Sequence, residues 1–310
     1  GHEGGALYGN TALNAGRPTG LSLAHCTFAE NICETSGGAL YCSDIDASID
    51  ACTFLANTAA ENGGALYNHR SSPSITNCVF GKNVAAGIGG AVANYNASNP
   101  EIVHATFVGN VAARGGAVSS QRNSDPLIRH CILWNNQADE GSSVVVARTT
   151  PGVAYTSTAT VEYCDIEGGQ SGTDADSGCR LTWGSGNLNV NPLFTGQSFD
   201  DYHLSSDSPC IDAGDPSVPA NAAASDRDGR TRPYGKSVDM GAYEYQGLGP
   251  VYRFWAPSQS RHFYTISGYE RDMLIDRYPE VWQFEAIAYY AFYQNSEANL
   301  VPVYRFWSAV

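Results

Sequence analysis

Three histidines occupy one position of a repeated sequence and could serve as metal ligands. His25, His104 and His130 each precede a column of small residues, mostly cysteines. If His104 and His130 lie on neighbouring turns, their imidazoles come close enough to share a metal. The same position in other repeats holds Ala51 and Asn77, and both Asn and His are enriched in left-handed bends. We therefore favour a structural bend over a metal site.

A second candidate for chemistry is the acidic sequence D-x-D-G at Asp226, Asp228 and Gly229. A calcium loop supplies five or more spaced oxygen ligands, and only a fragment of that spacing is present. Turns in which Asp side chains bond to backbone amides are the simpler interpretation. Ca²⁺ at Asp226 and Asp228 is the one cofactor that the sequence suggests.

The elements that position these residues are visible as a repeat of about 26 residues. A glycine pair begins at Gly37, Gly63, Gly89 and Gly115. Self-similarity at this period is typical of a solenoid, and the repeats contain short β-branched and aromatic segments without a helical period. We expect an all-β protein, with a right-handed parallel β-helix of 26-residue coils over residues 1–247 and a closing segment at about 189–247.

Stacked coils place equivalent residues one above another. An aromatic ladder inside the coil is expected at Phe28, Phe54, Phe80 and Phe107. A polar ladder is expected at Asn31, Asn57, Asn83, Asn110 and Asn136, because Asn tolerates left-handed backbone and its amide can bond to the next coil. A further inward column contains Cys26, Cys52, Cys78, Cys131 and Cys164. Off that column, Cys33 with Cys42 and Cys179 with Cys210 are the better disulfide candidates.

Catalysis would need carboxylates and basic residues on outward positions of consecutive coils. The positions that we assign outward carry none: they are Thr27, Thr53, Val79, Thr106, Ile132, the alanines 39, 65, 91 and 117, and then Tyr41, Tyr67, Ala93 and Ser119. The sequence thus predicts no catalytic residue. Binding through the variable loops is the remaining possibility, at His69, Arg70, Tyr95 and Arg122.

From residue 248 to 310 the composition becomes rich in aromatic residues. VYRFW occurs at 251–255 and again at 303–307, with HFYT at 262–265 between them. We expect a small, mainly β domain. Sugar rings stack on aromatic faces, which makes Tyr252, Trp255, His262, Tyr264 and Trp282 candidate ligand-binding residues. The alternative, that most of them fill the core of a very small domain, is the simpler one.

Several of these sequences resemble known families. The alternation of F-x-x-N with G-G-A-[LIV] resembles the repeats of chlamydial-type polymorphic outer-membrane proteins, which are surface adhesins with β-helical passenger regions. NVNPLF, DYHLSSDSPCIDAGDP and DRDGRTRPYGKSVDMGAYEY resemble the closing segment of bacterial surface β-helix proteins that carry interchangeable C-terminal anchors. The C-terminal sequence is similar to an uncharacterised repeat domain of secreted bacterial proteins. These resemblances imply a secreted or cell-surface location.

Charge restricts the partners. The chain has 31 acidic against 17 basic residues, which argues against nucleic acid and anionic membranes, and it has no apolar run long enough to insert into a membrane. We expect adhesion or an extracellular structural role without catalysis; a polysaccharide-binding or polysaccharide-cleaving protein is the alternative. The expected partners are surface glycans, or further copies joined head to tail, with residues 301–310 completing a neighbour's domain.

Overall fold

The computed structural model describes residues 4–10, 20–148, 156–218 and 224–292. The chain folds as two compact units, Gly1–Glu244 and Tyr245–Val310. The expected strand at 301–310 and its partner contact lie outside the described residues. Each unit is considered by itself.

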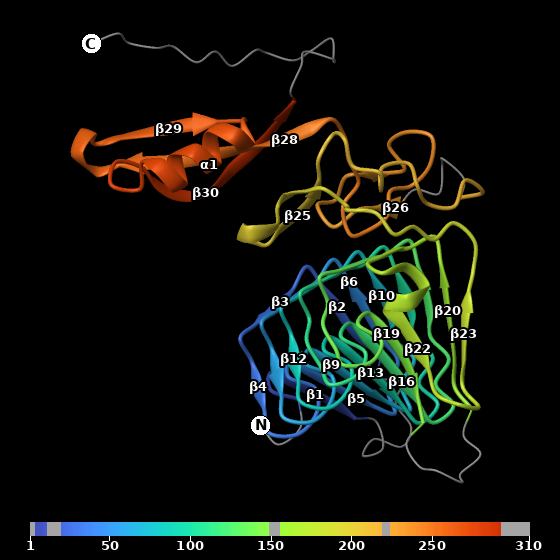
Figure 1. The fold of residues 1–310 in the computed structure, drawn as a ribbon. Helices are drawn as coiled ribbons and strands as arrows, with labels where there is room; N and C mark the ends of the chain where they lie inside the picture. The colour runs from blue at the N-terminus through green and yellow to red at the C-terminus, as the bar shows by residue number, and fades with distance from the viewer. Residues whose placement is uncertain (1–3, 11–19, 149–155, 219–223, 293–310) are drawn as a thin grey trace. The chain divides into compact units, whose positions relative to one another are not determined.

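The first unit contains a right-handed parallel β-helix of about six turns (Figure 1), which confirms the expected fold. The first sheet consists of β1 (Leu7–Asn10), β5 (Leu40–Ser43), β9 (Leu66–His69), β13 (Val92–Tyr95), β16 (Val118–Gln121), β19 (Val144–Ala147) and β22 (Thr173–Ala175). The second consists of β2 (Leu21–Ala24), β6 (Ala47–Asp50), β10 (Ser74–Thr76), β14 (Glu101–Val103), β17 (Leu127–Arg129), β20 (Thr158–Glu162) and β23 (Arg180–Trp183).

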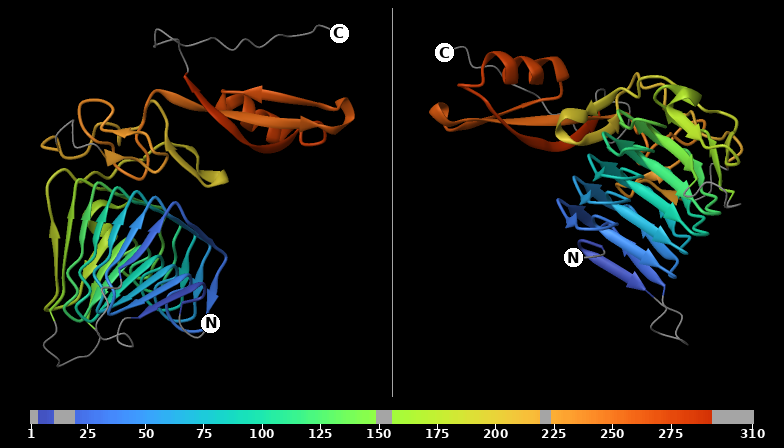
Figure 2. Two further views of the ribbon diagram at one scale, coloured as in Figure 1. Left: turned by 180° about the vertical axis from the view of Figure 1, so that it is seen from behind. Right: turned by 60° about the horizontal axis from the view of Figure 1, so that its bottom comes forward.

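Two shorter sheets complete each coil. The third sheet consists of β3 (Thr27–Ala29), β7 (Thr53–Leu55), β11 (Val79–Gly81), β15 (Thr106–Val108), β18 (Ile132–Trp134) and β21 (Asp165–Ile166), and the fourth of β4 (Ile32–Cys33), β8 (Thr58–Ala59) and β12 (Val84–Ala85). The 3₁₀ helix η1 (Gly169–Gly172) precedes β22. The chain visits the second, third, fourth and first sheets in turn, and Figure 2 shows the resulting stack of coils from two further sides.

Left-handed residues turn the chain between the sheets. The bend from the second to the third sheet has φ between 49° and 53° at His25, Ala51, Asn77, His104, His130 and Tyr163, so the bend interpretation of the three histidines is correct. The bend into the fourth sheet uses Glu30, Ala56, Lys82, Gly109 and Asn135. These residues come directly before the asparagine ladder. The asparagines themselves are not left-handed, so their role is to join the coils.

The asparagine ladder forms a continuous chain of hydrogen bonds. The side-chain amide of Asn57 donates to Oδ1 of Asn83 at 2.9 Å, and the backbone N–H of Asn57 donates to the same oxygen at 3.0 Å. Its second amide hydrogen reaches the carbonyl oxygen of Phe28 at 2.9 Å. The same pattern links Asn83 to Asn110 and Asn110 to Asn136. Asn57, Asn83 and Asn110 are fully buried, and their polar groups are thereby satisfied.

Apolar columns fill the interior beside this ladder. The rings of Phe28, Phe54, Phe80 and Phe107 stack with centroids 5.0, 4.8 and 4.7 Å apart and planes within 8°. Aromatic neighbours of this kind add to the stability gained from burial alone. The glycine pair permits the coils to approach, since a Cβ at Gly64 would overlap the carbonyl oxygen of Gly90. Where the chain turns after the pair, two successive residues of each coil face inward. The first of the two is an alanine that is fully buried in four coils, at Ala39, Ala65, Ala91 and Ala117. Our assignment of these alanines as outward was therefore wrong.

The closing segment folds back along the coils instead of ending the stack. It contains β24 (Phe194–Gly196), η2 (Gln197–Phe199), β25 (Asp201–Leu204), β26 (Ala224–Ser225) and β27 (Thr231–Arg232). The Ala242 N–H donates to Thr106 Oγ1 at 2.9 Å, and the Gly241 N–H donates to the His130 carbonyl at 2.8 Å. Tyr202 packs against Val79. Positions on the third sheet that we assigned outward are therefore covered: Val79, Thr106 and Ile132 are at most 3% exposed.

In its described residues, 245–292, the second unit is a three-stranded antiparallel sheet with one helix. Its strand order is β29 (Arg261–Thr265), β28 (Leu248–Ala256), β30 (Gln283–Phe292), and it also contains η3 (Pro257–Gln259) and α1 (Gly268–Arg277). The helix starts at the capping box that the sequence predicts, where Ser267 Oγ accepts from the Glu270 N–H. Tyr252, Phe254 and Leu274 form its buried core.

All nine cysteines are described, and all are free thiols. The disulfides expected for Cys33 with Cys42 and for Cys179 with Cys210 are therefore absent. The Cys33 thiol donates instead to the Ser36 carbonyl, and the Cys210 thiol donates to Asp165 Oδ2 at 3.3 Å. Burial raises the pKa of Cys42 to about 12, so this residue behaves as a small apolar side chain.

Replacing one asparagine inside the ladder tests its contribution. Asn83→Ala removes the acceptor of two buried Asn57 donors, and leaving such groups unsatisfied costs about 1–3 kcal/mol each. We expect the free energy of unfolding, measured by urea denaturation, to fall by about 3 kcal/mol. Asn31→Ala is the matched control, because Asn31 is half-buried in the first full coil; it should cost clearly less. Equal losses would contradict the ladder.

Candidate functional site

The loop residues singled out for binding come together on the first sheet. Tyr8, Tyr41, Tyr67 and Tyr95 form a row with ring centroids 5.2, 5.0 and 6.2 Å apart. The His69 ring lies 5.8 Å from that of Tyr95, and the Arg122 guanidinium lies 4.9 Å from the Tyr95 centroid. This is cation–π distance. We call these six residues the tyrosine–arginine face.

Hydrogen bonds and burial hold this face in one conformation. His69 lies 3.4 Å from Ser43 Oγ through Nδ1 and 3.3 Å from Asn96 Nδ2 through Nε2. Tyr67 is only 8% exposed, and burial raises its pKa. Tyr8, at 42% exposure, is the most open member of the row. The face is therefore a preorganised surface of aromatic rings with one cation.

Arg70 belongs to an ion pair next to this face. Its guanidinium donates from Nε and Nη2 to the two oxygens of Asp44 at 2.6 and 2.7 Å. The hydrogen bonds from Arg70 lower the pKa of Asp44 to about 2. Bidentate pairing of this kind occupies the guanidinium, so Arg70 contributes to the coil corner instead of offering an open cation.

A cluster of charges that sequence reasoning missed surrounds Arg114. Its guanidinium lies 2.5 Å from Glu140, 2.6 Å from Asp176 and 3.8 Å from Asp174. The three carboxylates have the spacing of a cation site. Arg114 already supplies a positive charge there, and its hydrogen bonds lower the pKa of Asp176. Arg114 and Glu140 pair across neighbouring coils at the repeat spacing. Asp174 and Asp176 belong to the later coil in which the spacing changes, which is why no sequence signal marks the whole cluster.

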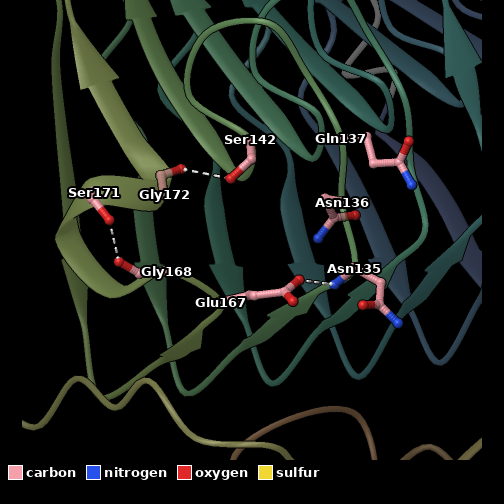
Figure 3. Close-up of a pocket in the computed structure, with 8 residues that line it drawn as sticks. All are labelled: Asn135, Asn136, Gln137, Ser142, Glu167, Gly168, Ser171 and Gly172. Carbon is pink, nitrogen blue, oxygen red and sulfur yellow. Dashed lines mark hydrogen bonds between the residues drawn. The ribbon is translucent and has the colours of Figure 1, made fainter.

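A shallow polar depression of about 430 Å³ lies on the last coils (Figure 3). Polar residues and glycines line it: Asn135, Asn136, Gln137, Ser142, Glu167, Gly168, Ser171 and Gly172. Much of its polar surface bonds to its own walls, as where Glu167 accepts from the Asn135 N–H at 2.6 Å and Ser171 Oγ donates to the Gly168 carbonyl at 2.6 Å. It offers no aromatic ring for stacking.

His104 and His130 do lie together, but they hold the closing segment. Their rings are 4.7 Å apart, and Arg232 Nη1 lies 2.5 Å from His104 Nδ1. His130 Nε2 accepts from the Asp215 N–H at 3.1 Å. A neutral imidazole can accept such bonds, whereas a metal ion would compete with the guanidinium for the same lone pair. This geometry speaks against a shared metal.

Arg232 is the centre of this contact. Its side chain is 1% exposed and donates to the Asp239 and Gly241 carbonyls at 3.1 and 3.2 Å. Glu244, which is fully buried, lies 3.6 Å away and balances the charge. A buried cation is tolerated only with such compensation. Nothing in the repeat predicts this pair, because it forms between residues of the irregular closing segment.

The proposed calcium ligands take part in the same network. Asp226 Oδ1 accepts from the Asp228 and Arg230 N–H groups at 2.9 and 2.8 Å, and Oδ2 accepts from the Glu244 N–H at 3.0 Å. This is the capped turn that we gave as the alternative. Asp228 lies 2.9 Å from His203 Nε2. Calcium at these carboxylates stays a proposal, and it would have to displace these bonds.

His203 lies between two carboxylates. Nδ1 lies 2.5 Å from Asp201 and Nε2 lies 2.9 Å from Asp228. Burial alone would lower the pKa of His203, but the hydrogen bonds to the two carboxylates outweigh it and raise the pKa. Both ring nitrogens lie against carboxylates, and this arrangement is typical of a structural clamp.

The aromatic residues of the second unit divide between the two sides of its sheet. Tyr252 and Trp282 belong to the core under α1, as the size argument suggests. Trp255, His262 and Tyr264 lie on the other side, where the Trp255 and His262 rings are 4.7 Å apart. Tyr289, which the sequence analysis did not select, joins them with its ring 6.5 Å from that of Tyr264.

Comparison with known proteins agrees with this fold. Residues 25–43 and 51–69 match the Chlamydia polymorphic membrane protein repeat, and residues 234–310 match a domain of unknown function (DUF5648). No curated protein and no solved structure matches the chain. The first unit is thus a parallel β-helix with repeats like those of polymorphic membrane proteins, and it fits a surface or outer-membrane protein. Among the described residues, the helices are too short or too polar to cross a membrane.

The buried histidines predict a pH dependence. Burial and the charge of Arg232 hold the pKa of His104 well below its usual value, and burial, with a smaller effect of Arg129, lowers that of His130 to about 4. The unfolded chain, with a pKa near 6.5, binds more protons between these values. Stability therefore decreases as the pH falls from 6.5 towards 4, by on the order of 3 kcal/mol for His130.

His130→Asn tests this pH dependence, because Asn77 shows that asparagine fits the bend. The variant should lose stability at pH 7 and show a flatter decrease in its urea midpoint between pH 6.5 and 4. His25→Asn, at an exposed copy of the same bend, should leave the wild-type pH dependence unchanged. If the His130 variant keeps the wild-type slope, His130 is not the titrating group.

Proposed function

We propose that the protein acts at a bacterial surface, secreted or surface-bound, as a non-catalytic adhesin. The β-helix is the scaffold in this proposal, and the tyrosine–arginine face is the binding surface. The observation that carries the proposal is that Tyr95 stacks with His69 and Arg122 on the outside of a rigid sheet. Rings and a cation already held in place lose little conformational entropy when they bind a partner. The repeat match supports the surface location.

The proposal is tested by adhesion of the purified, fluorescently labelled protein to cultured epithelial cells, followed by flow cytometry. Tyr95→Ala removes the ring on which Arg122 rests, and Arg122→Gln removes the cation. We expect each to reduce binding about tenfold, since central aromatic and Arg residues dominate many interfaces. Glu101→Ala, at an exposed position of β14, is the control and should bind like the wild type. Undiminished adhesion of both variants would refute the assignment.

Polysaccharide cleavage is a second candidate, and the cluster at Arg114 favours it. A basic residue facing carboxylates across coils is the arrangement that such an enzyme needs, and Glu140, Asp174 and Asp176 supply it. A general acid, however, needs a raised pKa, and the hydrogen bonds of Arg114 lower that of Asp176. Release of reducing ends from a polysaccharide would favour this candidate over adhesion alone.

A structural role through head-to-tail association is a further form of the proposal. At the first full coil the inward residues Leu21, Leu23 and Phe28 are only partly buried, whereas their equivalents in later coils are fully covered. Ile32, on the edge strand β4, is 71% exposed. Apolar side chains exposed at a strand edge favour pairing with another chain.

Sedimentation velocity over a range of concentrations tests this association. If the edge at β4 mediates it, the wild type should form larger species as its concentration rises, and Ile32→Lys should remain monomeric because a charge at an edge opposes pairing. Val84→Lys, at an exposed position of β12, whose outer edge is bridged to the next coil at Val111, is the matched control and should associate like the wild type. A wild type that stays monomeric throughout would contradict head-to-tail assembly.

A further inference from the structure

The sheet of the second unit has one face that α1 covers and one that it leaves open. Tyr252 and Phe254 point towards the helix, where Arg271 Nη1 donates to the Tyr252 hydroxyl at 2.8 Å and Leu274 packs beside them. Because side chains alternate along a strand, Arg253 and Trp255 of β28 point to the opposite side. We call that side the open face.

Four rings form a continuous path over this open face. The centroid distances are 4.7 Å from Trp255 to His262, 6.3 Å from His262 to Tyr264 and 6.5 Å from Tyr264 to Tyr289. Tyr264 and Tyr289 are 40% and 47% exposed. In contrast, Val251, which pairs with Tyr289, is only 7% exposed. The large rings are thus the accessible part of the face, and the aliphatic residue is the covered part.

A polar group links the rings. Glu285 Oε2 lies 2.8 Å from Arg253 Nε and 3.0 Å from His262 Nε2. These contacts fix the imidazole and the guanidinium in place on the open face. The Glu285 carboxylate and the Arg253 guanidinium are planar groups able to hydrogen-bond to hydroxyls beside an aromatic ring. The face therefore combines apolar ring surfaces with fixed hydrogen-bonding groups.

We propose that this open face of Trp255, His262, Tyr264 and Tyr289, with Arg253 and Glu285, is a binding site for a neutral polysaccharide. The C–H faces of a sugar bury against aromatic rings, and its hydroxyls find the charged pair. An anionic polymer is disfavoured because the chain carries a net charge of −14. An apolar protein partner would favour a face with exposed aliphatic residues, whereas each of these four rings carries a polar atom.

The site is independent of the tyrosine–arginine face, and its test keeps the two apart. The full chain is run in native gels that contain hydroxyethylcellulose, glucomannan, galactomannan or xyloglucan, with polygalacturonate as the anionic comparison. We expect at least one neutral polymer to retard the wild type. Trp255→Ala and Tyr264→Ser should each weaken that binding at least tenfold, while Tyr95→Ala should bind like the wild type.

Matched variants make the result decisive. Tyr278→Ala removes another exposed tyrosine, 48% accessible and outside the sheet, and should not change retardation. Circular dichroism verifies folding; if Trp255→Ala does not fold, Tyr264→Ser and Tyr289→Ser carry the test, since both alter exposed rings. Failure of all four neutral polymers to retard the wild type, retardation by polygalacturonate alone, or unchanged retardation of the folded ring variants would each overturn the proposal.

Discussion

The hydrogen-bonded asparagine ladder is the constraint on which the rest of the first unit depends. From Asn57 onward each Oδ1 accepts both a backbone and a side-chain N–H from the preceding coil, as Asn110 does from Asn83. A shift by one residue would leave buried amides without partners and turn the apolar columns outward. The ladder thus fixes the vertical register. The phenylalanine stack, the buried alanines and the spacing of the tyrosine–arginine face all follow from that register.

The repeated part of the fold could be predicted from the sequence because each coil has the same residue types at the same positions. The period of 26 residues, the Phe column and the bend at His25, His104 and His130 follow from residue types that recur at fixed spacing. The burial of Ala39 could not be predicted from the recurring residue types. It depends on two successive residues facing inward after the glycine pair, which breaks the simple alternation of a strand.

Contacts between distant, non-repeating segments explain most of what the sequence could not predict. The closing segment covers the third sheet through Arg232 and Ala242, and no local pattern marks the histidines as its partners. Asp226 of that segment bonds to the segment's own backbone. In the second unit, alternation along β28 separates Tyr252 from Trp255, but only the position of α1 decides which face is core. Tyr289 was missed because the irregular pairing within β30 obscures its face.

The two largest insertions into the 26-residue period occur at the same corner of the coil. Leu7 pairs with Leu40, and Arg129 pairs with Glu162, each 33 residues apart, and in both cases the extra residues fall between a strand of the first sheet and the next strand of the second. Strand pairing continues after each insertion, as where Leu21 pairs with Ala47 and Ile132 pairs with Asp165, so length at this corner is uncoupled from the core. Arg70, Asn96 and Arg122 occupy the same corner in other coils, beside the tyrosine–arginine face. New loops grafted here would change the surface beside that face while the folding determinants stay the same.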